Sequence, residues 1–199
     1  MPKQWDGREC VSEMKDGGSR QWKQMEWPGW FLEFLAENDP DAKQIFSGTK
    51  FGFCNATFDG FAGGAPWDLK SHVTHDKNGR EQPEIMLNDL ESSKLAVEEH
   101  GALYVAVVSG NAKFDEDGSF HEWHETIKGG KSKYQLSDPG RPSRIRKASF
   151  SVTSLDIFNL ELEELTVMQK GWKNSDGSLR EGKYALNTSK VKPVRRFSC

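Results

Sequence analysis

The chain has 199 residues, with 27 Lys and Arg against 30 Asp and Glu, and a formal net charge of −3. This length is ordinary for one compact domain, no stretch reaches the roughly eighteen consecutive apolar residues of a membrane span, and the charged start is unlike a signal peptide. The three cysteines, Cys10, Cys54 and Cys199, form no CxxC pair, which argues against a disulfide framework or a cysteine zinc site and favours a reducing cytoplasm.

The first patterned segment is predicted to be a helix over residues 26–37. Pro28 lies near its start, and Phe31 and Leu35 follow at helical spacing. The twenty residues at the beginning of the chain are polar and show no such pattern.

Two strands are predicted next, over residues 51–58 and 66–73. The connection 59–65 between them contains three glycines, which favour a flexible turn. Together these segments indicate a β-hairpin.

The second half of the chain continues the alternation of helices and strands. A helix is predicted over 88–100, with Asn88 as its N-cap, and a strand buried on both faces over 103–109. Further strands are predicted over 119–126 and 162–169. This order favours an α/β fold with a mixed central β-sheet flanked by helices.

Charged side chains gather on one face of the predicted strand 66–73. Because side chains alternate along a strand, Asp68, Lys70 and His72 share one face, and the apolar Trp67 and Leu69 take the other. A hairpin can bring Asp59, at the far end of the glycine-rich connection, close to Asp68. Two convergent carboxylates without nitrogen or sulfur ligands suit Mg²⁺, with Mn²⁺ as a substitute.

Such a site supports phosphodiester hydrolysis, because a metal can activate water while a lysine stabilises charge on the phosphate. Asp59 followed by Asp68-Leu69-Lys70 resembles the signature of the PD-(D/E)xK nucleases in its DxK form. Members of that family include restriction endonucleases, repair nicking enzymes and junction resolvases. The resemblance covers about residues 26–109.

The resemblance implies a restriction-endonuclease-like fold, in which Asp59, Asp68 and Lys70 are catalytic and the two aspartates hold the metal. The family also places a glutamate on the helix before the sheet, and Glu33 resembles it, with Glu26 as the alternative. Two simpler interpretations stay open. Asp59 can be the Asp-Gly of a turn, and Asp68 with Lys70 can be an exposed charge pair on a sheet.

Histidines raise a second metal hypothesis, because His72 and His75, and likewise His121 and His124, are three residues apart. On strands such pairs point to opposite faces, so we expect core or surface histidines and no zinc site. His72 remains a supporting group beside Lys70.

Charge is divided unevenly along the chain, which points to a polyanion-binding region. Residues 1–126 carry 12 basic and 23 acidic side chains, whereas residues 127–199 carry 15 basic and 7 acidic ones. Basic residues interleaved with Gly, Ser and Tyr can bind phosphates and base edges. The predicted DNA-binding residues are Lys128, Lys131, Lys133, Tyr134, Arg141, Ser143, Arg144, Arg146 and Lys147. The alternative is a solvated loop that balances the acidic half.

The sequence therefore predicts one nuclease domain over residues 1–199, with its catalytic core at about 26–109 and DNA recognition at about 127–199. The expected function is that of a type II restriction endonuclease that cuts double-stranded DNA as a homodimer. The alternatives are a repair or structure-specific nuclease of the same fold and a non-catalytic nucleic-acid-binding protein.

Overall fold

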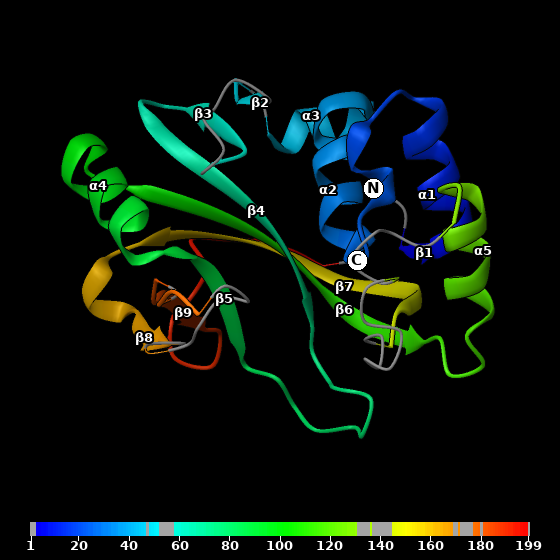
Figure 1. Cartoon of the computed structure of the whole chain (residues 1–199). Coiled ribbons are helices and arrows are strands. Elements are labelled where there is room, and N and C mark those ends of the chain that lie inside the picture. Colours follow the sequence, from blue (N-terminus) through cyan, green and yellow to red (C-terminus); the bar gives the residue numbers. More distant parts are fainter. Residues whose placement is uncertain are drawn as a thin grey trace.

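The computed structural model describes residues 3–46, 48–51, 58–130, 136, 145–168, 171, 177–179 and 181–198. It is an α/β protein with a mixed, curled central sheet and helices packed against it (Figure 1). In the described part of the chain the sheet has seven strands in the order β1-β7-β6-β4-β3-β2, and β10 also pairs with β7. The strands are β1 (Gln4–Asp6), β2 (Lys50–Phe51), β3 (Gly60–Ala62), β4 (Ala65–Val73), β6 (Leu103–Phe114), β7 (Lys147–Leu160) and β10 (Arg195–Ser198).

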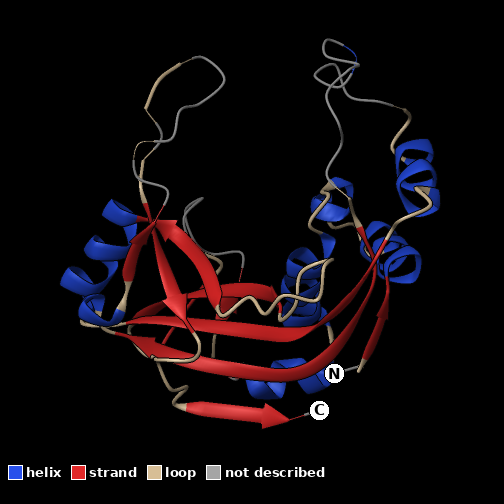
Figure 2. Cartoon of the chain, turned by 90° about the horizontal axis from the view of Figure 1, so that it is seen from below, coloured by secondary structure: helices blue, strands red, loops and turns tan. Residues whose placement is uncertain are grey.

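Both strand directions occur in this sheet. β2, β3 and β4 form an antiparallel meander, and Gly63 and Gly64 make the β3–β4 turn with φ angles of 60° and 83°, which favour glycine. β4 and β6 are parallel, so the chain crosses over between them through β5 (Glu84–Asp89) and α4 (Leu90–His100). β6 and β7 are antiparallel, and Figure 2 shows these long strands bending along their length.

Helices cover one face of the sheet. The larger hydrophobic core joins them to alternate residues of the central strands, among them Leu69 of β4, Ala106 and Val108 of β6, and Phe150 of β7. The packed elements are α1 (Gly7–Asp16), the short 3-10 helix η1 (Arg20–Lys23), α2 (Trp27–Asn38), α3 (Pro40–Ile45) and α5 (Ser119–Ile127). None of the helices in the described residues is long and apolar enough to cross a membrane.

A smaller sheet and α4 cover the opposite face. The small sheet has the order β5-β9-β8, where β9 is Lys183–Asn187 and β8 is Thr166–Met168. Its core contains Leu87 of β5, Leu186 of β9, and Val105 and Val107 of β6. β6 is therefore buried on both faces, as its apolar sequence predicts.

Several predicted elements are confirmed, and their bounds are corrected. The first helix is α2, the strand 66–73 lies within β4, and the helix at 88–100 is α4. Asn88 is in β5 and does not cap that helix. Of the strand predicted over 162–169, only β8 is extended, after the 3-10 helix η2 (Leu162–Glu164). Residues 52–57 of the strand predicted over 51–58 lie outside the described residues.

The strand predicted over 119–126 is wrong, because this segment is helix α5. The carboxylate of Asp115 accepts hydrogen bonds from the backbone N–H groups of Phe120 and His121 at 3.0 and 2.8 Å. These bonds satisfy donors of the first helical turn. The start of the chain, whose pattern predicted no element, forms β1 and helix α1, and Asp6 caps this helix through the N–H groups of Arg8 and Glu9.

Candidate active site

Asp59 lies where β3 and β4 separate. β3 pairs only with the first residues of β4, up to Trp67. The backbone N–H of Asp59 donates to the carbonyl of Trp67 at 3.0 Å, and its carboxylate accepts the backbone N–H of Leu69 at 2.7 Å. The side chain of Asp59 therefore takes the place of a neighbouring strand, which fixes the carboxylate against the edge of β4.

Asp68 and Lys70 form a close ion pair on β4. The Nζ of Lys70 lies 2.8 and 2.7 Å from the two carboxylate oxygens of Asp68. Asp68 is only 2% exposed. Nζ also donates to Oδ1 of Asn88 at 3.3 Å. Asn88 was missed as a site residue, because the sequence pattern there indicates a helix cap and no local signal shows that β5 passes Lys70.

The environment of Asp68 disfavours its charged form. Burial raises its pKa to about 7, Lys70 opposes this shift, and the negative charge and side-chain hydrogen bond of Asp59 add to it. Asp59 and Asp68 therefore interact directly, although the hairpin beside them is formed by β3 and β4, and β3 lies within the connection predicted over 59–65. Two adjacent carboxylates repel each other unless a proton or a cation lies between them.

Glu33 reaches the same place from α2. The helix passes close over β4, since a Cβ atom at Gly29 would lie 3.5 Å from Oγ of Ser71. Burial raises the pKa of Glu33 to about 9, with further contributions from Asp59 and Asp68 and an opposing one from Lys70. Glu33, Asp59, Asp68 and Lys70 are hereafter the carboxylate–lysine cluster.

Glu26, the N-cap of α2, and Glu37, within the helix, have surroundings that differ from those of Glu33. Glu26 forms an ion pair with Lys147 at the beginning of the helix. Glu37 lies one turn beyond Glu33 and also raises its pKa. Glu33 is therefore the helix carboxylate that meets Asp59, Asp68 and Lys70, and Glu37 is a neighbour that the sequence pattern did not single out.

The cluster has an excess of negative charge that suits a divalent cation. Burial and crowding of like charges raise the pKa values of both Glu33 and Asp68, and a bound cation would relieve that repulsion. Within the described ranges no group of three or more His, Cys, Asp or Glu side chains is arranged to hold a metal ion. A cation here would be bound by Asp59 and Asp68, and water and substrate would complete its coordination shell. Mg²⁺ is commonly bound in this way.

Among the residues that the structure describes, no histidine belongs to a group of three or more possible metal ligands. On helix α5, His121 and His124 are one turn apart, so the strand argument against them does not apply. The ring of His124 is nevertheless occupied, because Nε2 lies 2.8 Å from the carbonyl of Trp22 and Nδ1 lies 2.7 Å from the guanidinium of Arg146. His72 is buried, and burial lowers its pKa, which keeps the ring neutral beside the cluster.

The predicted DNA-binding segment is only partly described. Lys131, Lys133, Tyr134, Arg141, Ser143 and Arg144 lie outside the described residues. Arg146 is only 3% exposed, so its prediction as a DNA contact is corrected: the guanidinium is held inside the protein. Its Nη2 lies 2.5 Å from the carboxylate of Glu125 on α5.

The other two described residues of that set have partners in the protein as well. Lys128 lies 2.6 Å from the carboxylate of Glu125, and Lys147 pairs with Glu26. Glu125, Lys128, Arg146 and the neutral His124 are hereafter the α5 ion network. Farther along the chain, Arg196 of β10 likewise binds the buried carboxylate of Asp156 at 2.6 and 3.0 Å.

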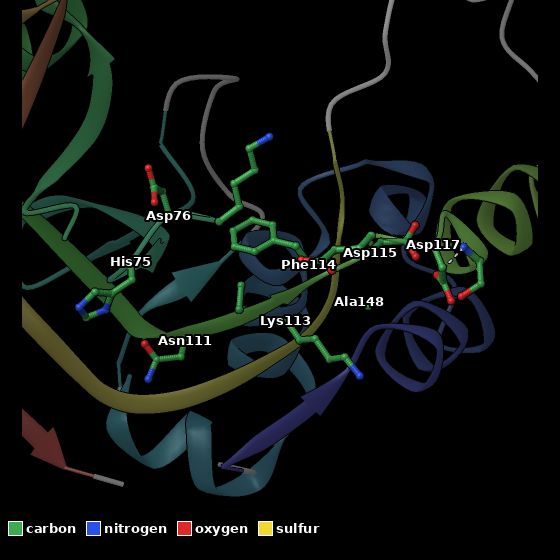
Figure 3. Close-up of a pocket in the computed structure, with 12 residues that line it drawn as sticks. His75, Asp76, Asn111, Lys113, Phe114, Asp115, Asp117 and Ala148 are labelled. Carbon is green, nitrogen blue, oxygen red and sulfur yellow. Dashed lines mark hydrogen bonds between the residues drawn. The ribbon is translucent and has the colours of Figure 1, made fainter. Parts of the chain in front are cut away.

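A cavity of about 600 Å³ lies at another place on the molecule. It is formed by the beginning of the β4–β5 connection, the end of β6 and the loop before α5 (Figure 3). Its lining includes His75, Lys77, Asn111, Lys113 and Phe114. No member of the carboxylate–lysine cluster lines this cavity, so it is a separate feature.

Fold and site together define an α/β protein whose mixed central sheet holds a lysine near one buried carboxylate and two half-buried ones. Comparisons with protein-family models, with curated proteins and with solved structures found no match. The function therefore has to be inferred from the residues and their geometry.

Proposed function

We propose that this protein is a metal-dependent endonuclease that hydrolyses phosphodiester bonds of double-stranded DNA. The observation that carries the proposal is the convergence of Glu33, Asp59, Asp68 and Lys70, which come from three separate places in the sequence. The order of elements also supports a restriction-endonuclease-like fold. The helix with the glutamate comes first, the meander with Asp59 and the DxK strand follows, and a crossover helix leads to a parallel strand.

The burial of Asp68 favours a catalytic site over the non-catalytic alternative. An exposed charge pair would lie in water, whereas this carboxylate is 2% exposed and shares its surroundings with two further carboxylates. Burying charges without balance is unfavourable, and such arrangements concentrate at functional sites. Binding DNA alone requires no such group.

Each residue has a role in the proposed hydrolysis. Asp59 and Asp68 would hold Mg²⁺ or Mn²⁺, which supplies charge neutralisation at the phosphate and lowers the pKa of a bound water. Lys70 presents its ammonium beside Asp68, where it can orient the attacking water or stabilise negative charge growing on the phosphate. Glu33 can hold a proton or a water at the edge of the same site, since its pKa lies near 9.

A type II restriction endonuclease acting as a homodimer fits this proposal best, because most such sites are symmetric and match a two-fold dimer. A repair or structure-specific nuclease of the same fold would use the same four residues. The two possibilities differ in substrate: the first cuts intact duplexes at one short sequence, and the second requires damage, a flap or a junction.

The test is a cleavage assay with purified protein on a mixture of plasmid and genomic DNA. We expect cutting with Mg²⁺ or Mn²⁺, binding without cutting with Ca²⁺, and no activity with EDTA. Asp68→Asn and Lys70→Ala should each lower the cleavage rate by roughly 100-fold or more. Lys94→Ala, on the exposed face of α4, is the matched control and should leave the rate unchanged. Cutting that survives EDTA, or that persists in both site variants, would exclude the mechanism.

A further inference from the structure

A polar arm, residues 74–83, connects β4 to β5 and projects beyond the central sheet (Figure 1). It is hereafter the β4–β5 arm. The N–H of Gln82 donates to the carbonyl of Thr74 and the N–H of Asp76 donates to that of Arg80, both at 2.8 Å. A bridge between His75 and Glu81 lies between these bonds. The arm is therefore a narrow two-stranded ribbon closed by a turn.

The turn at the tip is held in one shape by the chain itself. The carboxylate of Asp76 accepts the backbone N–H groups of Asn78 and Arg80 at 2.8 and 2.9 Å, and these bonds lower its pKa. Gly79 has a φ of 75°, which its lack of a side chain permits. Because the turn is already formed, a partner that binds it has little ordering entropy to overcome.

The side chains at the tip are those that recognise nucleic acid. Lys77 and Arg80 are exposed, and neither forms an ion pair with any described residue. Asp76 directs its carboxylate at the backbone of the turn and also interacts with Arg80, so the tip carries two positive charges against one negative charge. Residues 74–82 contain no apolar side chain, which argues against a hydrophobic protein contact or a lipid surface.

The arm also lies at a suitable distance from the carboxylate–lysine cluster. It continues strand β4, and Lys77 follows Lys70 by seven residues, which spans at most about 23 Å at 3.3 Å per residue. DNA rises 3.4 Å per base pair, so this span corresponds to at most about seven base pairs. One duplex can therefore touch the cluster and the arm together.

We propose that the β4–β5 arm enters the major groove of the DNA beside the cleaved bond, where Arg80 reads a base and Lys77 binds a phosphate. The major groove is about 12 Å wide and admits a two-stranded ribbon, and the arginine fork matches the paired acceptors of guanine. This inference rests on the proposed endonuclease function, and it places sequence reading in the acidic half of the chain.

The experiment is selection from random-sequence duplexes in Ca²⁺, followed by salt titrations on the enriched duplex and on a scrambled one. Arg80→Ala should weaken binding to the enriched duplex by about 5- to 150-fold and leave the scrambled duplex nearly unaffected. Lys77→Ala should weaken both duplexes alike and lower the log-log salt slope by about one. Lys43→Ala is the matched control, because this exposed lysine lies on α3, far from the arm in Figure 1.

The outcomes separate the arm from the proposed function. If the wild-type protein cuts DNA but Arg80→Ala selects the same sequence with the same affinity, the arm does not read DNA and the endonuclease stands. If the wild-type protein neither binds nor cuts duplexes, the endonuclease proposal fails and the arm inference fails with it. Protection of the amides of residues 77–80 from hydrogen exchange by the enriched duplex is a second, independent expectation, and its absence contradicts the arm's role.

Discussion

The carboxylate–lysine cluster and the α5 ion network are both buried groups of charges, yet they are balanced differently. The first gathers the carboxylates of Glu33, Asp59 and Asp68 around Lys70 alone. The second gathers Lys128 and Arg146 around Glu125, with His124 neutral beside them.

The pKa values of the carboxylates record this difference. Burial and like charges raise the pKa of Glu33 to about 9 and that of Asp68 to about 7. Burial would also raise the pKa of Glu125, but hydrogen bonds from Lys128 and Arg146 hold it below its ordinary value. The buried carboxylate of the α5 ion network is therefore balanced by cations, which stabilises the packing of its elements, whereas carboxylates crowded together with too few cations are typical of functional sites. Buried charge by itself therefore does not indicate a functional site. The stronger indication is a group of carboxylates with too few cationic partners, as in the carboxylate–lysine cluster.

The largest expected effect is on stability, from breaking the balanced network. Arg146→Ala should lower the free energy of unfolding by about 3 to 5 kcal/mol, because it removes the buried guanidinium that pairs with Glu125 and contacts His124. Urea unfolding measures this, with Lys94→Ala of the exposed Lys94–Glu98 pair as a control that changes stability by at most about 0.5 kcal/mol. The double change Arg146→Met with Glu125→Leu should recover most of the lost stability. If Arg146→Ala alone were as stable as the wild type, the network would have no structural role.

The second effect is on catalysis, from removing the carboxylate that α2 contributes to the unbalanced cluster. Glu33→Gln should lower the cleavage rate by roughly 10- to 100-fold, as loss of a supporting group at a metal site does. Glu26→Gln is the control, because Glu26 lies at the beginning of the same helix, pairs with Lys147 of β7 and is not part of the cluster. Cleavage rates at saturating Mg²⁺ compare the two, and a larger loss in Glu26→Gln would reassign the helix carboxylate.

The two clusters should also respond to pH in opposite directions. The pKa of Glu33 is raised from 4.5 to about 9, so its stabilising protonated form is complete below about pH 4.5 and is lost as pH rises toward 9. Burial lowers the pKa of His124 to about 4, so its contribution is complete above pH 6.5 and is lost as pH falls toward 4. The midpoint of thermal unfolding (Tm), measured as a function of pH, reports both effects: the alkaline limb, where Tm falls as pH rises, and the acidic limb, where Tm falls as pH falls.

The effect of Mg²⁺ on Tm tests the carboxylate–lysine cluster without any measurement of activity. Because a cation favours ionised carboxylates, Mg²⁺ should raise Tm by more at about pH 9 than at about pH 5. Glu33→Gln should flatten the alkaline limb and leave the acidic limb in place. An alkaline limb that is identical in this variant would show that Glu33 does not hold the proton.

The smallest effect concerns Asn88, which accepts a hydrogen bond from Lys70. Asn88→Ala should lower kcat by roughly 3- to 10-fold and leave KM unchanged, because one hydrogen bond to a charged group that positions the ammonium is lost. Asn88→Asp, which keeps the acceptor, should retain more activity than Asn88→Ala. An effect on KM alone would assign Asn88 to DNA binding and not to the positioning of Lys70.

Local patterns in the sequence determined several features that the structure confirms. The alternation of β4 placed Asp68 and Lys70 on one face, and the apolar run of β6 predicted burial on both sides. The helical spacing of α2 placed Glu33 on a helix before the sheet. These features follow from periods of two or 3.6 residues, which neighbouring side chains reveal by themselves.

Only the tertiary structure decided which of these residues meet. Asn88 approaches Lys70 because β5 pairs with β9, almost a hundred residues later, and Arg146 is buried where it meets Glu125 and His124 of α5. The sequence predicted a strand where helix α5 forms. The structure shows that Asp115, which lies before the helix, accepts a backbone N–H of its first turn. Charge composition showed that residues 127–199 are basic, but it did not show that Lys128, Arg146 and Lys147 have acidic partners inside the protein. Such partners are set by packing between distant segments, and packing leaves no periodic signal in the sequence.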